Sequence, residues 1–277
     1  MIGKNQKIRY GYKNASINSN PVFKRIMSKT MLMQRRKIWR NRLIGKDIAY
    51  KRHVYEKYIQ GRTEVSESTL QTILADIPRT FGEKETFGDD IIQQLLMEYA
   101  TVQAGDCYLQ GFSYFMSLIW QVFRLSDNAK ADSFWCFCKI VGIVRPMMPD
   151  FNSKWFDWNR KCWINLLVNE IRKKRPLLGS IIDEELEIFS SLILVKWYML
   201  WFSQNIVYEE LMTLWDFLIT VPPDKLMLTY NSIALVIINQ AADDIVYQCD
   251  GQSTLVINKI LNLKIYNVNN LLKLIGP

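Results

Sequence analysis

An arginine and a glutamine in two separate loop-like phrases are the residues of this chain best suited to chemistry. Arg79 lies in the phrase ILADIPRT at 73–80, and Gln110 lies in the phrase YLQG at 108–111. A guanidinium is always charged and can neutralise the charge that develops on a transferred phosphoryl group, while a carboxamide can orient an attacking water. The two side chains could therefore assist the hydrolysis of a nucleoside triphosphate held by another protein.

The arginine phrase follows a predicted helix that has to end just before Arg79. Ser66 is a typical N-cap residue, and the apolar residues after it recur at threes and fours, which predicts a helix that begins near Ser66. Pro78 ends this helix, because proline removes a backbone donor and disfavours the helical conformation at the residue before it. We therefore expect Arg79 on an irregular segment, with its side chain projecting from the surface. The alternative is an ordinary ion pair between Arg79 and Asp76.

The glutamine phrase lies between two further predicted helices. Asp89 or Asp90 caps the first of them, and Gly105 breaks the chain after it. The second covers about 110–124 and is apolar on nearly every side, which is typical of a buried central helix. We expect Gln110 to meet solvent where this helix begins. The alternative is a solvated side chain without any function.

The remaining apolar periodicity also predicts helices, and no stretch shows the alternation of a strand. Helices are expected at about 22–43, 48–59, 130–144, 154–173, 181–195, 197–203, 207–219, 225–242 and 253–275. Breaks are expected at Pro146 and Pro149, at Pro176 and Gly179, and at Pro222 and Pro223. The predicted fold class is all-α, with about a dozen or more helices and no sheet. Residues 1–22 are expected to form a basic flexible arm before one helical domain at 23–277.

The composition supports one large core and argues against several classes of protein. Hydrophobic residues make up 49% and aromatic residues 13% of the 277 residues, which is ample for a core. The five cysteines show no CxxC spacing and His53 is the one histidine, so neither a disulfide framework nor a metal site is expected. The uncharged stretches 107–123 and 226–242 are too short and too polar to span a membrane. The polar, basic start carries no secretory signal, so a cytoplasmic location is expected.

Positive charge is concentrated at the start of the chain. Residues 1–62 hold 17 Lys and Arg against Asp47 and Glu56, a net +15, and the remaining residues carry a net −7. Such a segment can attract an anionic membrane or an acidic partner. Nucleic acid is not expected, because no nucleic-acid-binding motif accompanies the charge. The alternative is a solvated arm followed by a helix with a basic outer face.

Three short motifs occur in a recognisable order. An arginine stands four residues before a tryptophan, at Arg35 and Trp39. An IxxDxxRT motif is formed by Ile73, Asp76, Arg79 and Thr80. A YxQG motif is formed by Tyr108, Gln110 and Gly111. Together with the aromatic run at 197–202 and the Trp215-Asp216 pair, these motifs resemble the TBC domain family of Rab GTPase-activating proteins over about 35–244.

The resemblance implies an elongated multi-helix TBC-type domain that binds a Rab-like small GTPase in its GTP-bound form. It implies that Arg79 is an arginine finger and Gln110 a glutamine finger, and that GTP and Mg²⁺ are carried by the partner, so the chain needs no cofactor of its own. Supporting roles fall to Asp76, Thr80, Tyr108 and Gly111. Purely structural roles fall to Ile73, Arg35, Trp39, Trp215 and Asp216. It also implies vesicle trafficking at the cytosolic face of endomembranes.

The chain departs from the family pattern at several positions. Cys107 stands where the family usually has glycine, and Leu109 and Phe112 replace its usual cysteine and methionine. Because Cys107 has less backbone freedom than glycine, the glutamine loop could be displaced. The alternative function is therefore a catalytically weak or inactive scaffold that binds a small GTPase or its effectors. We expect a glycine at position 111 because the missing side chain allows the partner's backbone to approach closely.

Overall fold

The computed structural model describes residues 29–60, 65–81, 88–102, 108–145, 157 and 160–275. Within this part of the chain there are thirteen α-helices and no strand, which confirms the all-α prediction. The nearest approach to a sheet in these residues is a single parallel bridge between Ile206 and Ile265. The predicted arm at 1–22 and residue Cys107 lie outside the described residues.

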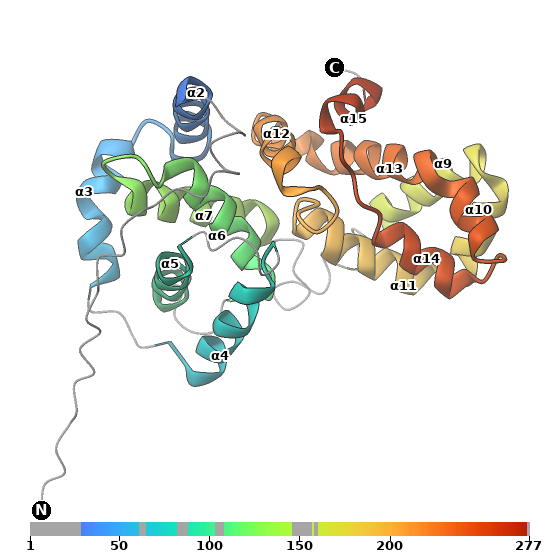
Figure 1. The fold of residues 1–277 in the computed structure, drawn as a ribbon, viewed down its shortest axis with the longest axis horizontal. Helices are drawn as coiled ribbons and strands as arrows, with labels where there is room; N and C mark the ends of the chain where they lie inside the picture. Colours follow the sequence, from blue (N-terminus) through green and yellow to red (C-terminus); the bar gives the residue numbers. More distant parts are fainter. Residues whose placement is uncertain are drawn as a thin grey trace, which may run out of the picture.

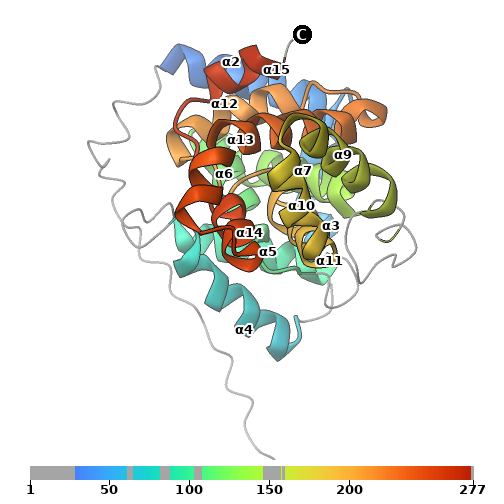
Figure 2. The ribbon, with the colours of Figure 1, turned by 90° about the vertical axis from the view of Figure 1, so that its right-hand side faces the viewer.

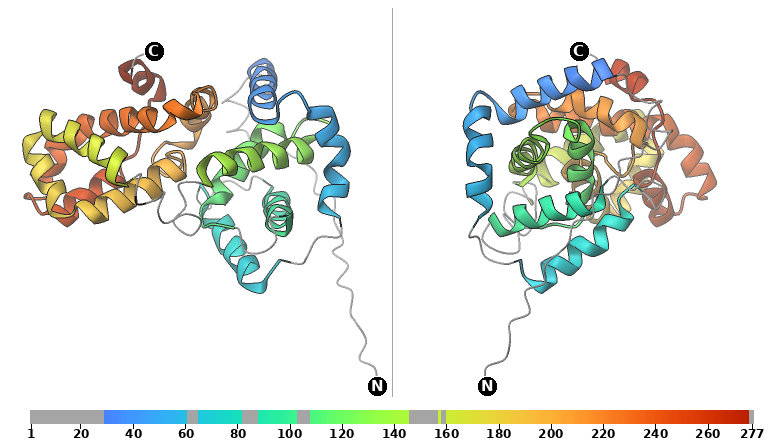
Figure 3. Two further views of the ribbon diagram at one scale, coloured as in Figure 1. Left: turned by 180° about the vertical axis from the view of Figure 1, so that it is seen from behind. Right: turned by 60° about the vertical axis from the view of Figure 1, so that its left-hand side comes forward.

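The helices form two groups that lie side by side along the long axis (Figure 1), and the view from behind shows the same division (Figure 3). We call the first group the N-terminal lobe: α2 (Lys29–Trp39), α3 (Ile48–Ile59), α4 (Glu67–Asp76), α5 (Asp89–Val102), α6 (Phe112–Phe123) and α7 (Ala129–Val144). We call the second the C-terminal lobe: α9 (Asn165–Lys174), α10 (Pro176–Glu184), α11 (Leu186–Leu192), α12 (Tyr208–Leu218), α13 (Leu226–Gln248), α14 (Ser253–Leu261) and α15 (Val268–Ile275). Of the second group, α12 lies nearest the N-terminal lobe.

Helix α6 is the central helix of the N-terminal lobe, as its sequence predicts. Nearly all of its side chains are buried, and it packs against α2, α5 and α7. The ring of Phe112 lies 5.6 Å from that of Phe137 on α7 and 6.3 Å from that of Tyr99 on α5. The buried body of α6 therefore holds its first residues, next to Gln110, in a defined place.

A buried carboxylate joins three elements of the same lobe. Asp132 on α7 is fully buried and accepts hydrogen bonds from Arg40 Nε at 2.7 Å and from Arg52 Nε at 2.7 Å. Arg40 lies in the π-helical turn Arg40–Ile44 that follows α2, and Arg52 lies on α3. Two arginines of the basic first part of the chain thus pair with a buried carboxylate of the fold.

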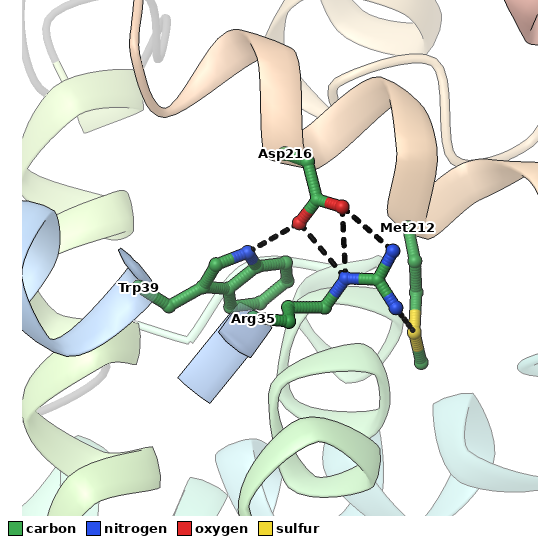
Figure 4. Close-up of polar contacts among 4 residues, drawn as sticks. All are labelled: Arg35, Trp39, Met212 and Asp216. Atoms are coloured by element: carbon green, nitrogen blue, oxygen red, sulfur yellow. Dashed lines mark hydrogen bonds and ion pairs between the residues drawn. The ribbon is translucent and has the colours of Figure 1, made fainter. Parts of the chain in front are cut away.

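The two lobes are connected through α2 and α12 (Figure 4). Arg35 donates to both carboxylate oxygens of Asp216, with distances of 2.6 to 2.9 Å, and Trp39 Nε1 donates to the same group at 2.7 Å. The ring of Trp39 also stacks on that of Trp215 at 5.9 Å. Arg35, Trp39, Trp215 and Asp216, for which the family resemblance implies structural roles, therefore contact one another.

Several predicted boundaries are wrong in the C-terminal lobe. The break expected at Pro176 and Gly179 is instead the first turn of α10, because proline is tolerated at a helix start. Gly179 lies within α10, where α9 packs closely against it. A Cβ at this position would be 2.8 Å from the Cα of Arg172, which explains why the residue is glycine. The helix expected at 253–275 is two helices, α14 and α15.

The segment expected to be a helix at 197–203 is also different. A π-helical stretch, Ile193–Met199, continues directly from α11, and a turn follows it. Trp201 and Phe202 in this turn have positive φ angles of 48° and 58°, although neither is a glycine. Such a conformation costs on the order of 1–3 kcal/mol for each residue, and it persists because both rings are completely buried.

Four cysteines lie in the described residues, Cys136, Cys138, Cys162 and Cys249, and none of these four forms a disulfide. No helix among the described residues has the length and apolar character that crossing a membrane requires.

Candidate functional site

Arg79 lies in a short turn directly after α4. The Ser66 side chain accepts a hydrogen bond from Thr69 N at 3.2 Å and caps α4, as the sequence predicts. The helix ends at Asp76, and Ile77–Arg79 forms one turn of 3₁₀ helix with Pro78 at its second position. The Arg79 side chain is exposed. Both Figure 1 and Figure 2 show α4 low in the N-terminal lobe.

Asp76 connects the arginine phrase to the glutamine phrase. Its side chain is 5% exposed, and its Oδ2 accepts hydrogen bonds from Tyr108 Oη and from Gly111 N, each at 2.7 Å. The two donors flank Gln110, whose own side chain is exposed. The fold therefore brings Arg79 and Gln110 onto adjacent loops, although they lie far apart in the sequence.

Two further contacts join the loops. The Thr80 hydroxyl lies 2.6 Å from the hydroxyl of Ser113 and 2.9 Å from the backbone oxygen of Asp76. Tyr114 Oη donates to the backbone oxygen of Arg79 at 3.2 Å. Thr80 is thus a contact residue within the site, and Ser113 and Tyr114 join it without having been predicted.

The Asp76 carboxylate does not bind Arg79. In the described part of the chain no ion pair holds the Arg79 guanidinium, so the alternative of an ordinary Asp76–Arg79 pair is not formed. Burial, followed by the charge of Asp76, raises the pKa of Tyr108 well above its ordinary value of 10.0. Tyr108 is therefore a neutral donor to Asp76, and the Arg79 side chain is left available to another molecule.

Gly111 occupies a conformation and a space that suit glycine. Its φ is +99°, and a Cβ at this position would lie 2.9 Å from Cδ2 of Leu200. Within this molecule the close approach is therefore to the side chain of Leu200. The approach of a partner's backbone to Gly111 stays a prediction. The sequence did not indicate that Leu200 contacts this loop. Leu200 belongs to the C-terminal lobe, so the contact depends on how the two lobes pack.

An aromatic cluster lies beside Arg79. Phe81 has a positive φ of 59°, and its ring contacts those of Tyr114 and Tyr208 edge-on, with centroids 5.0 Å and 4.7 Å apart. Tyr208 begins α12, so this cluster also joins the two lobes. Sequence reasoning missed Phe81 and Tyr208 because their contact depends on how the lobes pack.

The departures in the glutamine motif are accommodated where the structure describes them. Leu109 is half-buried and packs against the core. The Phe112 ring is fully buried and contacts the ring of Tyr108 edge-on at 5.8 Å. Among the described residues, no group of three or more His, Cys, Asp or Glu side chains could hold a metal ion.

A family model described as Rab-GTPase-TBC domain matches residues 31–246. The chain belongs to this family. The match includes both loops, the Asp76 connection and the Arg35–Asp216 pair. The TBC fold therefore accounts for the common position of Arg79 and Gln110.

Two human relatives show similarity over part of the chain. TBC1 domain family member 17 is 24% identical over 170 residues, covering 59% of this chain and 25% of that protein. Growth hormone-regulated TBC protein 1 is 26% identical over 170 residues, covering 58% of this chain and 47% of that protein. The matches thus span between a quarter and about half of the length of these relatives.

A solved structure agrees with the fold. The crystal structure of the Ypt/Rab-GAP domain of Gyp1p superposes with a TM-score of 0.67, and the match covers 91% of each chain. The sequences are 15% identical over this match, so the likeness shows a shared TBC fold.

Proposed function

We propose that this TBC domain protein is a GTPase-activating protein, which accelerates GTP hydrolysis by a Rab-family small GTPase. The observation that carries the proposal is the pair of exposed side chains, Arg79 and Gln110, on two loops joined by the buried Asp76. Membership of the Rab-GTPase-TBC family supports the same partner class.

In the proposed mechanism the chain docks on the GTP-bound partner and supplies two side chains in trans. The Arg79 guanidinium neutralises charge on the phosphoryl oxygens as the bond to the leaving phosphate loosens. Gln110 orients the attacking water. In other GTPases an arginine supplied in this way accelerates hydrolysis by about 10³- to 10⁵-fold.

GTP and Mg²⁺ belong to the partner in this proposal, and the chain contributes no cofactor. The chain is not expected to hydrolyse GTP by itself. We also propose a cytoplasmic protein that acts in vesicle trafficking at the cytosolic face of endomembranes, where its basic first residues contact anionic lipid.

A hydrolysis screen against a panel of GTP-loaded Rab proteins tests the function. We expect Arg79→Ala to abolish the stimulated rate of phosphate release while leaving most of the binding intact, because the guanidinium acts mainly in the transition state. Arg79→Lys should also lose most of the rate, because an ammonium lacks the planar fork of donors. Arg42→Ala, at an exposed arginine of the N-terminal lobe, is the matched control.

Gln110→Ala should lower the stimulated rate strongly, and Gln252→Ala, at an exposed glutamine of the C-terminal lobe, should not. Full activity of both Arg79→Ala and Gln110→Ala would rule out the two-finger mechanism. If GTP-loaded partners bind the wild type but release phosphate at their intrinsic rate, the chain is instead a TBC-like scaffold.

A further inference from the structure

The segment 200–208, which we call the support turn, runs through a turn to the first residue of α12 and contacts both loops of the proposed site. It connects the π-helical stretch Ile193–Met199 to α12 and belongs to the C-terminal lobe, whereas both loops belong to the N-terminal lobe. Its first and last residues, Leu200 and Tyr208, make the contacts. A single short segment therefore lies against two loops that are separate in the sequence.

Leu200 lies against the glutamine loop. Two of its methyl carbons are within 3.1 Å of the place that a Cβ of Gly111 would take, so the leucine side chain rests directly on the backbone next to Gln110. The same glycine is also bound by the Asp76 carboxylate, which accepts a hydrogen bond from Gly111 N. Gly111 thus contacts both a carboxylate of its own lobe and an apolar side chain of the other.

Tyr208 lies against the arginine loop. Its ring contacts Phe81 at a centroid distance of 4.7 Å, and Phe81 is two residues after Arg79. Phe81 also contacts Tyr114, whose hydroxyl donates to the Arg79 backbone oxygen. The arginine loop is therefore also held between the two lobes.

The support turn is itself held firmly by its own lobe. Trp201 lies 5.2 Å from the ring of Trp215, and both Trp201 and Phe202 keep positive φ angles inside the core. Asn205 Nδ2 donates to the backbone oxygens of Leu261 and Leu263, at 2.8 Å and 3.0 Å. A turn fixed in this way can transmit the position of the C-terminal lobe to the two loops.

We propose that Leu200 and Tyr208 are positioning residues, which set the relative placement of Gln110 and Arg79 through Gly111 and Phe81. This inference rests on the proposed function for its catalytic meaning. In this proposal residues of both lobes set the geometry of the site, although Arg79 and Gln110 both belong to the N-terminal lobe.

Leu200→Ala tests the glutamine side of the proposal. Removing the side chain frees the Gly111 backbone, so we expect kcat of stimulated hydrolysis to fall by about tenfold or more, since a displacement near 1 Å can cost on the order of a hundredfold. KM should change by less than about twofold, because the lost contact is not part of the docking surface. Leu200→Met keeps the volume and should keep most of the rate.

Tyr208→Ala tests the arginine side in the same assay. It removes the ring that Phe81 contacts, so kcat should fall without a matching change in KM. Tyr208→Phe keeps the ring and should restore kcat to near the wild-type value. Equal losses in Tyr208→Phe and Tyr208→Ala would contradict a role for the ring contact.

Leu178→Ala is the control for general destabilisation. Leu178 is 2% exposed, comparable with Leu200 at 3%, and lies on α10 at the far end of the C-terminal lobe (Figure 1). This variant should lose stability without losing kcat. If it lowers kcat as much as Leu200→Ala does, the positioning role is wrong.

Amide hydrogen exchange at Gly111 gives a readout that needs no GTPase. The Gly111 N–H is bonded to Asp76, so we expect it to exchange faster in Leu200→Ala than in the wild type or in Leu178→Ala. Faster exchange with no stimulation of any GTPase by the wild type would reject the proposed function and retain the positioning role. Unchanged exchange and unchanged kcat in Leu200→Ala would reject the positioning role.

Discussion

Asp76 is the residue on which the geometry of the site depends most directly. It lies at the end of α4, three residues before Arg79, yet its carboxylate binds the phrase that carries Gln110. A carboxylate accepts several hydrogen bonds at once, which a neutral side chain of similar size does less well. One buried oxygen can therefore set the separation of two loops.

Asp76→Ala should lower the free energy of unfolding and abolish stimulated hydrolysis together. It leaves the buried donors of Tyr108 and Gly111 without an acceptor, at a cost of roughly 1–3 kcal/mol for each. Urea denaturation followed by circular dichroism measures the loss. Asp76→Asn retains an acceptor oxygen and should lose less, and an Asp76→Ala variant as stable as the wild type would contradict the role of this group.

Gly111→Ala should destabilise the protein more than Gly251→Ala does. Both glycines have a positive φ, which costs an alanine about 1–2 kcal/mol. At Gly111 the new Cβ also meets Leu200, whereas nothing lies within 4 Å of a Cβ at Gly251. Thermal or urea unfolding of the two variants gives the comparison, and equal losses would show that the Leu200 contact yields without cost.

At the scale of elements, partly buried ion pairs join helices outside the two loops. Asp132 joins α7, α3 and the turn after α2, and Asp216 joins α12 to α2. The first pair holds the N-terminal lobe, and the second holds the two lobes to one another. Among the described residues these aspartates bind Arg40, Arg52, Arg35 and Trp39, none of which lies in the two loops. Their effect on function should therefore come through the fold.

Asp132→Ala should be strongly destabilising, by about 3–5 kcal/mol, because it leaves the half-buried Arg40 and Arg52 without their counter-charge. Asp183→Ala is the matched control. Asp183 pairs with Arg172 on the surface, where solvent screens the interaction, so its loss should hardly change stability. Chemical denaturation distinguishes the two, and a similar small effect in both variants would contradict a structural role for Asp132.

At the scale of the whole molecule, two lobes meet beside the proposed site. Both fingers come from the N-terminal lobe, while the residues that support their loops include members of the C-terminal lobe. The charge is divided as well, since residues 1–62 are strongly basic and the rest of the chain is acidic in balance. Three arginines of the basic part, Arg35, Arg40 and Arg52, are internal partners of Asp216 and Asp132. The residues before α2 add six further Lys and Arg to the basic balance of the sequence.

Deleting residues 1–28 should weaken binding to anionic vesicles and leave stimulated hydrolysis unchanged. This segment holds six Lys and Arg and no acidic residue. Each basic residue near an anionic surface contributes about 1 kcal/mol at low salt. Sedimentation with phosphatidylserine vesicles at low and high salt measures the binding, and neutral vesicles are the control. Equal binding of both forms to anionic vesicles would reject the membrane contact.

Local features of the sequence predicted much of the fold. Ser66 and Pro78 mark the two ends of α4 because capping and the loss of a backbone donor act within a few residues. The buried α6 follows from its uniform apolar character. Prediction was wrong at Pro176, where proline begins α10 instead of breaking a helix. It was also wrong at the support turn, where burial of Trp201 and Phe202 outweighs the local backbone preference.

The amino-acid sequence by itself determined the helical class and the two motif phrases, and it predicts Arg79 and Gln110 as the residues for chemistry. These properties depend on side-chain type, periodicity and short spacings, so they can be read along one stretch of chain. Only the tertiary structure decided that Asp76 binds Gly111, 35 positions away, and that Leu200 lies against the same glycine. Such contacts arise when separate helices pack into a common core, and no local pattern encodes which of their residues will meet.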